Sequence, residues 1–491
     1  MIEHYLSFDF GAESGRAILG TLDDDGLLQI EQLHRFHNGM IDVMGSLHWD
    51  TLGLYREMLE GMHICAENHT SQPVAIGVDT WGVDFALLDS HGALIGAPWA
   101  YRDQRTCGAM EEFLSKISRE RLYQLTGTAF FPFNTLFQLY SMVRDQSPQL
   151  EIASDLLFIP DLLNYFITGV KQSEFTFATT SQLYNPRISD WEDEVFDQLA
   201  LPKGMMQKVV QPGTIVEELS GSVSAQTGLK GIPVVAVASH DTGSAIAAVP
   251  TSEKDFAFIS SGTWSVMGIE SPTPITDEKA LKYNFTNEGG VCGTFRVLKN
   301  ITGLWLLQQC RSEWSRTRDC TYDDLVKMAE RAAPFRSIID PDCPEFVNPA
   351  SMPLAIQRFC KEAGQPVPDE MGQCVRSILE SIALAYRFTL EQLEEVSRQN
   401  MGRIHIVGGG SQNNLLCQFT ASATGLPVYA GPVEATAIGN TLVQAMAFGT
   451  VSSLDHLREV VRRSFGLNSY EPQSTSDWDE PYERFMRLKR K

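Results

Sequence analysis

The sequence lacks features typical of nucleic-acid-binding, membrane and secreted proteins. Its 39 Lys and Arg residues are outnumbered by 61 Asp and Glu residues, which gives a formal net charge of -22. Nucleic acids and anionic membranes require basic patches, so this balance argues against both as partners. No uncharged apolar run approaches a membrane span, and no basic segment followed by an apolar one opens the sequence. A secretory signal is therefore not expected.

The nine cysteines also lack a recognisable pattern. They are scattered from Cys65 to Cys417, their number is odd, and no C-x-x-C pair occurs. We therefore expect free thiols and a cytoplasmic location. A bridge between Cys360 and Cys374 is the less favoured alternative. No patch or heptad indicates an oligomeric state, so a monomer and a homodimer both stay open.

Two strand-turn-strand segments are the most informative features present. Residues 5–20 and 256–268 each place glycine and hydroxyl residues in a tight turn between two apolar runs. Such turns expose backbone N–H groups that can hold phosphate oxygens. The first loop does not fit a dinucleotide fingerprint, because Gly11 and Gly15 are four apart and a strand follows. A Walker loop is excluded because no Lys-Ser/Thr follows Gly15. The alternative is that both segments are ordinary hairpin turns. The presence of two such loops in one chain makes this alternative less favoured.

Strand and helix patterns alternate in both halves of the chain, which predicts a mixed α/β fold. Strands are expected at 5–10, 15–20, 27–30, 74–78, 233–238, 404–407 and 427–430, with helical spacing at 54–62 and 379–393 and a short helix near Asn414. The polar stretch around 245–254 suggests a boundary between domains 1–244 and 245–491. The segment after Ser469 is expected to fray.

Two aspartates are candidate catalytic groups. Asp9 interrupts an apolar strand, where a carboxylate is costly to bury unless it is paired or close to a metal. We predict that it holds Mg²⁺ directly or through water; capping its own turn is the alternative. Asp241 follows a strand end and is predicted to accept the proton of an attacking hydroxyl. Its alternative role is the N-cap of a helix beginning near Ser244.

Three further residues are candidates for substrate binding. His240 is predicted to hydrogen-bond the substrate beside Asp241. Gly82 would let the backbone approach a small ligand closely. Trp81 fits a sugar-facing wall and a core position about equally, with the core slightly favoured.

Ten segments, taken in order, resemble the FGGY family of carbohydrate kinases over about residues 5–450. They are 33–36 (LHRF), 80–85 (TWGVDF), 101–106 (YRDQRT), 133–136 (FNTL), 239–242 (SHDT), 260–265 (SSGTWS), 298–300 (LKN), 303–308 (GLWLLQ), 407–413 (VGGGSQN) and 430–435 (AGPVEA). Many FGGY kinases read Lys-Leu-x-Trp where this chain has residues 138–141 (QLYS). That departure favours the subgroup that acts on L-rhamnulose.

The resemblance implies two actin-like (ribonuclease H-like, ASKHA) domains with a catalytic cleft between them. It also implies transfer of the γ-phosphate of MgATP to the 1-hydroxyl of L-rhamnulose, in L-rhamnose catabolism. The implied nucleotide contacts are Ala12, Glu13, Ser14, Gly15, Arg16, Thr263, Gln308 and Gly409. The implied ketose contacts are Gly82, His240, Asp241, Thr242 and Asn300, with Asp241 as the proton acceptor. Glu13 is expected to point away from the phosphates, because its carboxylate would repel them.

Two other function classes are weighed against a kinase. A kinase for another ketose, of the L-fuculose, L-xylulose or D-ribulose type, is the nearest alternative. A non-catalytic sugar or nucleotide sensor on the same fold is less expected, because a sensor need not keep both Asp9 and Asp241. A chaperone-like ATPase is disfavoured because no substrate-binding domain follows residue 480.

Overall fold

The computed structural model describes residues 2–489 and divides into two compact units. Unit 1 comprises the chain up to Ala248 together with Glu270–Val297 and Ala435–Ser464. Unit 2 comprises Val249–Ile269, Leu298–Glu434 and the chain from Phe465 onward. Unit 1 therefore draws on segments from both halves of the sequence, whereas unit 2 lies within the second half. The division into domains 1–244 and 245–491 stays a prediction.

Unit 1 is built on a mixed sheet in the order β13-β14-β6-β1-β2-β3. The strands are β1 Glu3–Phe10, β2 Ser14–Leu22, β3 Leu28–His37, β6 Ala75–Thr80, β13 Thr214–Glu218 and β14 Pro233–Ala236. β1 pairs antiparallel with β2 in the predicted hairpin, and it pairs parallel with β6, which in turn pairs parallel with β14. The carboxyl ends of these parallel strands meet at one edge, where α/β folds usually bind ligands.

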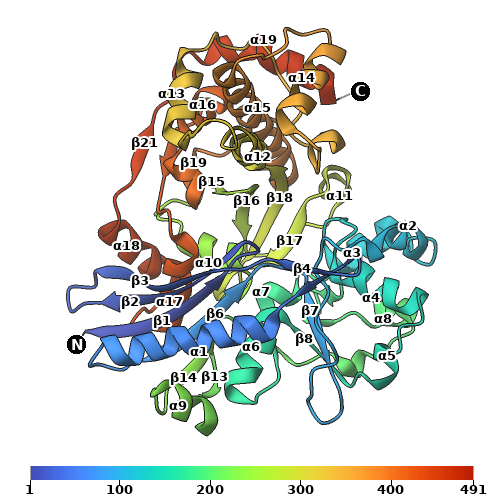
Figure 1. Cartoon of the computed structure of the whole chain (residues 1–491), viewed down its shortest axis with the longest axis vertical. Coiled ribbons are helices and arrows are strands. Elements are labelled where there is room, and N and C mark those ends of the chain that lie inside the picture. Colours follow the sequence, from blue (N-terminus) through green and yellow to red (C-terminus); the bar gives the residue numbers. More distant parts are fainter. Residues whose placement is uncertain (1, 490–491) are drawn as a thin grey trace. The chain divides into compact units, whose positions relative to one another are not determined.

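Helices cover the unit 1 sheet, and α17 approaches it closely. The helix α1 (Thr51–Asn68) packs Met58 and Met62 into an apolar core with Phe8 of β1. The helix α17 (Ala435–Ala447) lies beside β1 (Figure 1) and contacts it through a Ser7–Thr441 hydroxyl hydrogen bond of 2.9 Å. A Cβ on Gly20 would lie 2.3 Å from Thr441, so this approach requires glycine in the strand.

The other helices and strands of unit 1 are all shorter than α1 and can be followed by colour in Figure 1. They are β4 Met40–Val43, β5 Ser46–Trp49, β7 Phe85–Leu88, α2 Ala109–Phe113, α3 Arg119–Thr126, α4 Thr135–Arg144, α5 Gln149–Ile152, β8 Asp155–Phe158, α6 Ile159–Thr168, β9 Ser173–Glu174, α7 Phe175–Ala178, β10 Tyr184–Asn185, β11 Asp190–Trp191, α8 Asp193–Leu199, β12 Val209–Val210, α9 Gly221–Thr227, α10 Asp241–Ala247, α11 Glu278–Tyr283, β17 Thr286–Gly289 and α18 Leu454–Ser464.

Unit 2 has a sheet in the order β18-β16-β15-β19-β20-β21. Its strands are β15 Phe256–Ser261, β16 Trp264–Ser271, β18 Phe295–Thr302, β19 Arg403–Val407, β20 Val428–Ala430 and β21 Asn468–Tyr470. Its helices are α12 Trp305–Trp314, α13 Tyr322–Arg331, α14 Met352–Glu362, α15 Met371–Ser397, α16 Asn414–Thr424 and α19 Asp479–Lys489. The second predicted hairpin is β15–β16, and the predicted strand-loop-helix-strand unit is β19, α16 and β20.

The end of the chain differs from the expectation. Instead of fraying, the described part of this segment (residues 470–489) ends in α19, with Tyr482 and Phe485 buried and Trp478 buried just before the helix; residues 490–491 of the predicted tail lie outside the described residues. The charged residues Glu483 and Arg484 lie between Tyr482 and Phe485, and this amphipathic spacing stabilises the helix against unit 2. No helix within residues 2–489 is long and apolar enough to cross a membrane.

Candidate active site

The carboxyl ends of β1 and β6 place two buried aspartates side by side. Asp9 and Asp79 are paired residues in the parallel ladder, and both are buried. Asp79 Oδ2 accepts a 2.6 Å hydrogen bond from Asn440 Nδ2 of α17, while its Oδ1 has no hydrogen-bond partner among the described residues. Burial and the charges of Asp9 and Asp241 raise the pKa of Asp79 well above its ordinary value. The neutral form of Asp79 is therefore favoured, because a further ionised carboxylate would add to the negative charge of Asp9 and Asp241 at this edge.

Asp9 is paired across the hairpin with Arg16. Arg16 Nη2 lies 2.5 Å from Asp9 Oδ2, and the two residues are partners in the β1–β2 ladder. Within residues 2–489, no group of three or more His, Cys, Asp and Glu side chains is arranged to hold a metal ion. The unpartnered oxygen of Asp79 beside Asp9 nevertheless fits a Mg²⁺ ion, which usually takes one or two carboxylates and completes its shell with water and phosphate oxygens.

The first predicted phosphate loop is a tight turn that is held by hydrogen bonds from Asn38. Gly11 N–H donates to Ser14 O at 3.0 Å, so Ala12 and Glu13 form the tip. The buried Asn38 donates from its side chain to Gly11 O at 2.8 Å and from its backbone N–H to Glu13 O at 3.1 Å. The side chain of Glu13 is exposed. Sequence reasoning missed Asn38, because its partners lie in a different hairpin.

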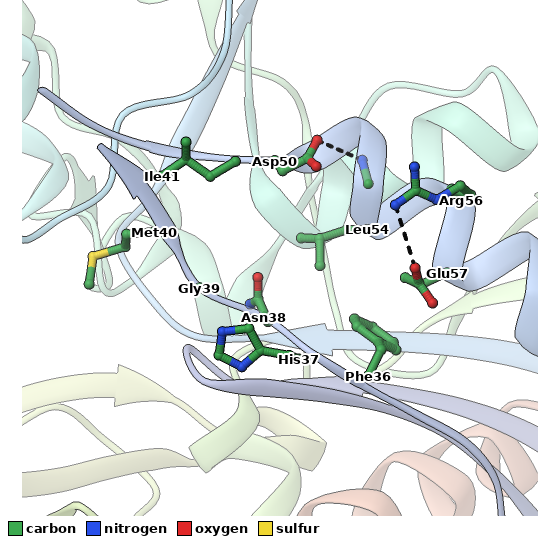
Figure 2. Close-up of a pocket in the computed structure, with 11 residues that line it drawn as sticks. Phe36, His37, Asn38, Gly39, Met40, Ile41, Asp50, Leu54, Arg56 and Glu57 are labelled. Carbon is green, nitrogen blue, oxygen red and sulfur yellow. Dashed lines mark hydrogen bonds and ion pairs between the residues drawn. The ribbon is translucent and has the colours of Figure 1, made fainter. Parts of the chain in front are cut away.

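Asn38 also lines a cavity of about 270 Å³ between the end of β3 and the start of α1. Figure 2 shows its labelled residues, with Phe36 and His37 on one side and Asp50, Arg56 and Glu57 on the other. Asp50 caps α1 by accepting from Gly53 N–H at 2.8 Å. None of the predicted site residues lines this cavity, which therefore lies outside the predicted active site.

Asp241 is the first residue of α10, with His240 as the N-cap. The helix begins three residues before Ser244, where the sequence suggested its start, so the alternative N-cap role of Asp241 is wrong. Thr242 donates to Asp241 Oδ1 from its backbone N–H at 2.5 Å and from its hydroxyl at 3.0 Å. About a third of the Asp241 side chain is exposed (31%). The carboxylate is thus oriented yet accessible to a substrate.

The backbone before Asp241 is held by a buried glutamate. Ser239 N–H donates to Glu174 Oε2 at 3.1 Å, and His240 N–H donates to Thr176 Oγ1, also at 3.1 Å. Thr176 Oγ1 in turn donates to the same Glu174 oxygen at 2.5 Å. Burial raises the pKa of Glu174 to about 7, although these hydrogen bonds lower it in part. Sequence reasoning missed Glu174. The available signal was that Glu174 is the one charged residue in the segment 172–182.

The imidazole of His240 lies between two carboxylates. Its Nε2 is 3.5 Å from Asp241 Oδ1, and its Nδ1 is 3.1 Å from Glu288 Oε2. A Cβ on Gly82 would lie 3.2 Å from His240 Nε2, so these two predicted ketose contacts are neighbours. Burial alone would raise the pKa of Glu288, but the charges of His240 and Arg296 hold it below its ordinary value.

Trp81 belongs to the core, as the favoured alternative predicted. It is 5% exposed, its ring centroid lies 4.0 Å from that of Trp49, and its Nε1 donates to Asp84 Oδ2 at 2.9 Å. Asp84 also accepts from Trp49 Nε1 at 2.6 Å, from Tyr101 N–H at 3.1 Å and from Gln138 Nε2 at 2.9 Å. Burial raises the pKa of Asp84 to about 6. Gln138, the departure noted in the sequence, is thus a partner of this buried carboxylate.

The second predicted phosphate loop and the loop around Gly409 follow neighbouring strands of unit 2. Thr263 lies in the turn between β15 and β16, and its carbonyl accepts from Trp305 N–H at 3.1 Å. Gly409 follows β19, which pairs parallel with β15 up to the pair Ser260–Val407. Both loops therefore leave the sheet at the same end of neighbouring strands, as a nucleotide site in this fold requires.

The other two predicted residues of unit 2 lie on adjoining elements. Gln308 is in the first turn of α12, where its backbone N–H donates to Leu304 O at 2.8 Å. Asn300 lies within β18 and is partly buried. In unit 1 the structure brings together Arg16, Gly82, His240, Asp241 and Thr242 around Asp9 and Asp79.

Comparison with known proteins decides the family. The FGGY carbohydrate kinase N-terminal domain matches residues 4–248, and the C-terminal domain of the same family matches residues 257–448. The chain belongs to the FGGY family of carbohydrate kinases. It is therefore an enzyme that phosphorylates a carbohydrate, and the resemblance inferred from the ten segments is confirmed.

Relatives and solved structures extend this match over the whole chain. The FGGY kinase is 46% identical over 486 residues to a rhamnulokinase of Bacteroides thetaiotaomicron, covering 99% of each chain. A rhamnulokinase of Pectobacterium carotovorum is 42% identical, with 99% of this chain and 97% of the relative covered. The fold matches a ligand-bound xylulose kinase from Lactobacillus acidophilus with a TM-score of 0.83 at 15% identity, covering 99% and 98% of the two chains. It also matches a Plasmodium falciparum glycerol kinase with ADP, with a TM-score of 0.78 at 15% identity and the same coverage. The predicted two-domain actin-like α/β fold is confirmed.

Proposed function

We propose that this FGGY kinase is a rhamnulokinase: it transfers the γ-phosphoryl group of ATP to the 1-hydroxyl of L-rhamnulose in L-rhamnose catabolism. The products are L-rhamnulose 1-phosphate and ADP. The observation that carries the proposal is the 46% and 42% identity, over nearly the full length, to two relatives named rhamnulokinase. The geometry of unit 1 supports the reaction type independently, because the accessible carboxylate of Asp241 stands at the start of α10 and lies close enough to Asp79 for its charge to raise the pKa of Asp79.

Asp241 is the proton acceptor in this proposal. The ketose 1-hydroxyl gives its proton to the Asp241 carboxylate, its oxygen bonds to the γ-phosphorus, and the bond from that phosphorus to the ADP oxygen breaks. The two hydrogen bonds from Thr242 hold the carboxylate in place for this step. Because phosphoryl transfer has a loose transition state in most analyses, positioning contributes more than base strength.

The remaining predicted residues bind the two substrates. Gly82, His240, Thr242 and Asn300 are proposed to contact the ketose. Ala12, Glu13, Ser14, Gly15, Arg16, Thr263, Gln308 and Gly409 are proposed to contact ATP. The glycines Gly262 and Gly409 support the nucleotide role, since a Cβ at Gly262 would meet nothing nearer than 3.7 Å and one at Gly409 nothing within 4 Å. Packing within the protein therefore leaves room for a side chain at both positions. A phosphate that approaches the backbone closely would need that room, which explains glycine at these positions.

Asp9 is proposed to hold the Mg²⁺ that accompanies ATP, directly or through water, with Asp79 beside it. When bound, Mg²⁺ neutralises charge on the phosphate oxygens. The paired Arg16 would supply a second positive charge facing the phosphates. We further propose that the enzyme works in the cytoplasm as a monomer or homodimer, without nucleic-acid or membrane partners, in keeping with its net charge of -22.

A ketose screen tests the proposal directly. ADP production in a coupled assay is measured with L-rhamnulose, L-fuculose, L-xylulose and D-ribulose at equal concentrations. We expect kcat/KM for L-rhamnulose to exceed the others by about 10- to 100-fold, the range that one or two altered substrate contacts produce. If another ketose gives the highest kcat/KM, that ketose replaces L-rhamnulose as the proposed substrate. ATP binding without ketose-dependent ADP release would favour the sensor alternative.

A further inference from the structure

Two aspartates in the segment between α13 and α14 bind Lys489, which lies in the last turn of α19. Lys489 Nζ is 2.7 Å from Asp340 Oδ1 and 2.9 Å from Asp342 Oδ2. Its side chain is 18% exposed, and Nζ also lies 5.6 Å from the ring centroid of Phe485 and 5.8 Å from that of Phe388. Burial alone would lower the pKa of Lys489, but the two carboxylates raise it above its ordinary value. The lysine is therefore a charged group that ties α19 to this segment.

Asp342 connects Lys489 to the end of β18. Its Oδ1 accepts a hydrogen bond of 2.8 Å from the N–H of Thr302, the last residue of β18, while its Oδ2 faces Lys489. Burial alone would raise the pKa of Asp342, but Lys489 and the Thr302 N–H hold it below its ordinary value, so the carboxylate stays ionised. A hydrogen bond to an ionised acceptor is roughly twice as strong as a neutral one. The same segment makes a second contact, because Phe346 O accepts from Trp305 Nε1 at 3.2 Å.

Residues 303–305 connect this support to the second predicted phosphate loop. Leu304 N–H donates to Gly262 O at 2.9 Å, and Trp305 N–H donates to Thr263 O at 3.1 Å. Two successive carbonyl groups of the loop are thus held by residues that immediately follow the end of β18. All of these residues belong to unit 2.

These two hydrogen bonds determine which way the donors of the loop point. A trans peptide unit directs its N–H opposite to its C=O. Because the carbonyls of Gly262 and Thr263 face residues 304–305, the N–H groups of Thr263 and Trp264 point away from those residues. Successive N–H groups that share a direction can hold phosphate oxygens. The position of residues 304–305 therefore sets the direction of the phosphate donors.

We propose that Lys489 and Asp342 form a positioning clamp, which fixes residues 302–305 and through them orients the second phosphate loop for ATP. The nucleotide part of this inference rests on the proposed kinase function, in which Thr263 contacts ATP. The clamp itself rests on the contacts within unit 2. Lys489 and Asp342 touch no substrate in this proposal. They are positioning residues that act through Thr302.

Calorimetric titration with ATP in the absence of ketose tests the clamp. Lys489→Met removes the charge and keeps an unbranched chain beside Phe388 and Phe485. We expect it to weaken ATP binding by about 3- to 10-fold, the range that one net hydrogen bond corresponds to. Asp342→Leu should weaken ATP binding by about 10-fold or more, because the Thr302 N–H then loses its acceptor. Lys489→Arg keeps the charge and should stay close to the wild type.

Two further measurements separate positioning from a general loss of stability. Hydrogen–deuterium exchange of the amides of residues 302–305 should be faster in Lys489→Met, whereas exchange in the strands of unit 1 should not change. Steady-state kinetics of the same variant should show a KM for ATP that rises more than the KM for the ketose. A merely structural role would change neither ratio.

Arg484→Met is the matched control. Arg484 lies in the same helix, its side chain is 25% exposed, and its hydrogen bonds go to residues 335, 336 and 365. The variant therefore removes a different anchor of α19. It should lower the melting temperature and leave the affinity for ATP unchanged.

Two outcomes would overturn the inference: an unchanged affinity for ATP in Lys489→Met and Asp342→Leu, or an equal loss in Arg484→Met, which would assign the effect to the docking of α19 as a whole. Should Asp342→Leu fail to fold, Asp342→Asn replaces it and should behave like Lys489→Met. A wild-type enzyme that does not bind ATP would refute the proposed function, while hydrogen exchange would still report on the clamp. Normal ATP binding in the wild type and in the clamp variants would refute the clamp alone.

Discussion

Gly15 and Phe36 are packed so closely that residue 15 has no room for a side chain. A Cβ on Gly15 would lie 2.2 Å from Cζ of Phe36 and 2.8 Å from Cδ1 of Phe10. The glycine of the first phosphate loop is therefore required by the packing of the hairpin itself. Gly262 differs, because a Cβ there would meet nothing nearer than 3.7 Å. The two loops consequently allow ligand binding and folding to be tested separately.

Gly262→Val should weaken ATP binding by about 10-fold or more while leaving the melting temperature nearly unchanged, because the added methyl groups crowd the phosphate and not the fold. Gly15→Val should instead lower the free energy of unfolding by about 1–3 kcal/mol or more through overpacking. Calorimetric titration with ATP and thermal unfolding distinguish the two. An unchanged ATP affinity in Gly262→Val would reduce the second loop to a structural turn.

Asp241→Asn should reduce kcat by about 100- to 10,000-fold, the usual contribution of a positioned general base. Ketose binding should be largely retained, because the amide keeps the shape of the carboxylate and one acceptor oxygen for Thr242. The measurements are ketose-dependent ADP release and the dissociation constant of the ketose without nucleotide. Near-normal turnover would remove Asp241 from the proton-acceptor role. Similar losses of binding and turnover would assign it to binding alone.

Asp84→Asn should destabilise the protein by about 1–3 kcal/mol, the cost of a buried donor left without a partner. Asp84 Oδ2 accepts hydrogen bonds from two tryptophans and a backbone amide, and Asp84 Oδ1 accepts one from Gln138 Nε2. In the asparagine variant, the NH₂ group that replaces Oδ1 would face the NH₂ group of Gln138. Adding Gln138→Glu restores an acceptor there and should recover much of the loss. A double-mutant cycle by urea unfolding measures this coupling. Additive effects would contradict the assigned contact.

Glu174 should make the protein less stable as pH rises from about 5 to 7.5. Its pKa is about 7 in the folded protein, above the ordinary value of 4.5. Between these values the folded state binds more protons than the unfolded state, so the free energy of unfolding falls with rising pH, by roughly 3 kcal/mol for this group. Urea unfolding at the two pH values should show a smaller fall in Glu174→Gln than in the wild type. Equal falls would mean that another group dominates.

Local pattern was enough to predict the elements that carry the chemistry. The two hairpins, the strand ends near Asp79 and before Asp241, and the loop around Gly409 all follow from apolar runs that stop at glycine or polar residues. Their partners were not predictable in the same way. Asn440 reaches Asp79 from 361 positions away, and Glu174 reaches the Ser239 backbone from 65 positions away. A local pattern carries no information about such pairings, which depend on how the sheet is covered.

The start of α10 illustrates a different limit. Asp241 is a good N-cap residue by type, and the sequence suggested a helix that begins near Ser244. An isolated bridge pairs His240 with Thr80 four residues beyond the end of β14 at Ala236, and the helix begins immediately afterwards. Tertiary pairing therefore moves Asp241 from a cap to the first helical residue.

The position of α17 against β1 and β6 has a consequence for how the protein is made. Gln444 donates to Leu6 O at 3.2 Å, and Asn440 satisfies Asp79, so the first strands to leave the ribosome are completed by one of the last helices. Nearly the whole chain must be synthesised before the sheet of unit 1 is covered on this face. A nascent chain ending near residue 430 would leave Asp79 without this amide, and we expect it to depend on chaperones until synthesis passes α17.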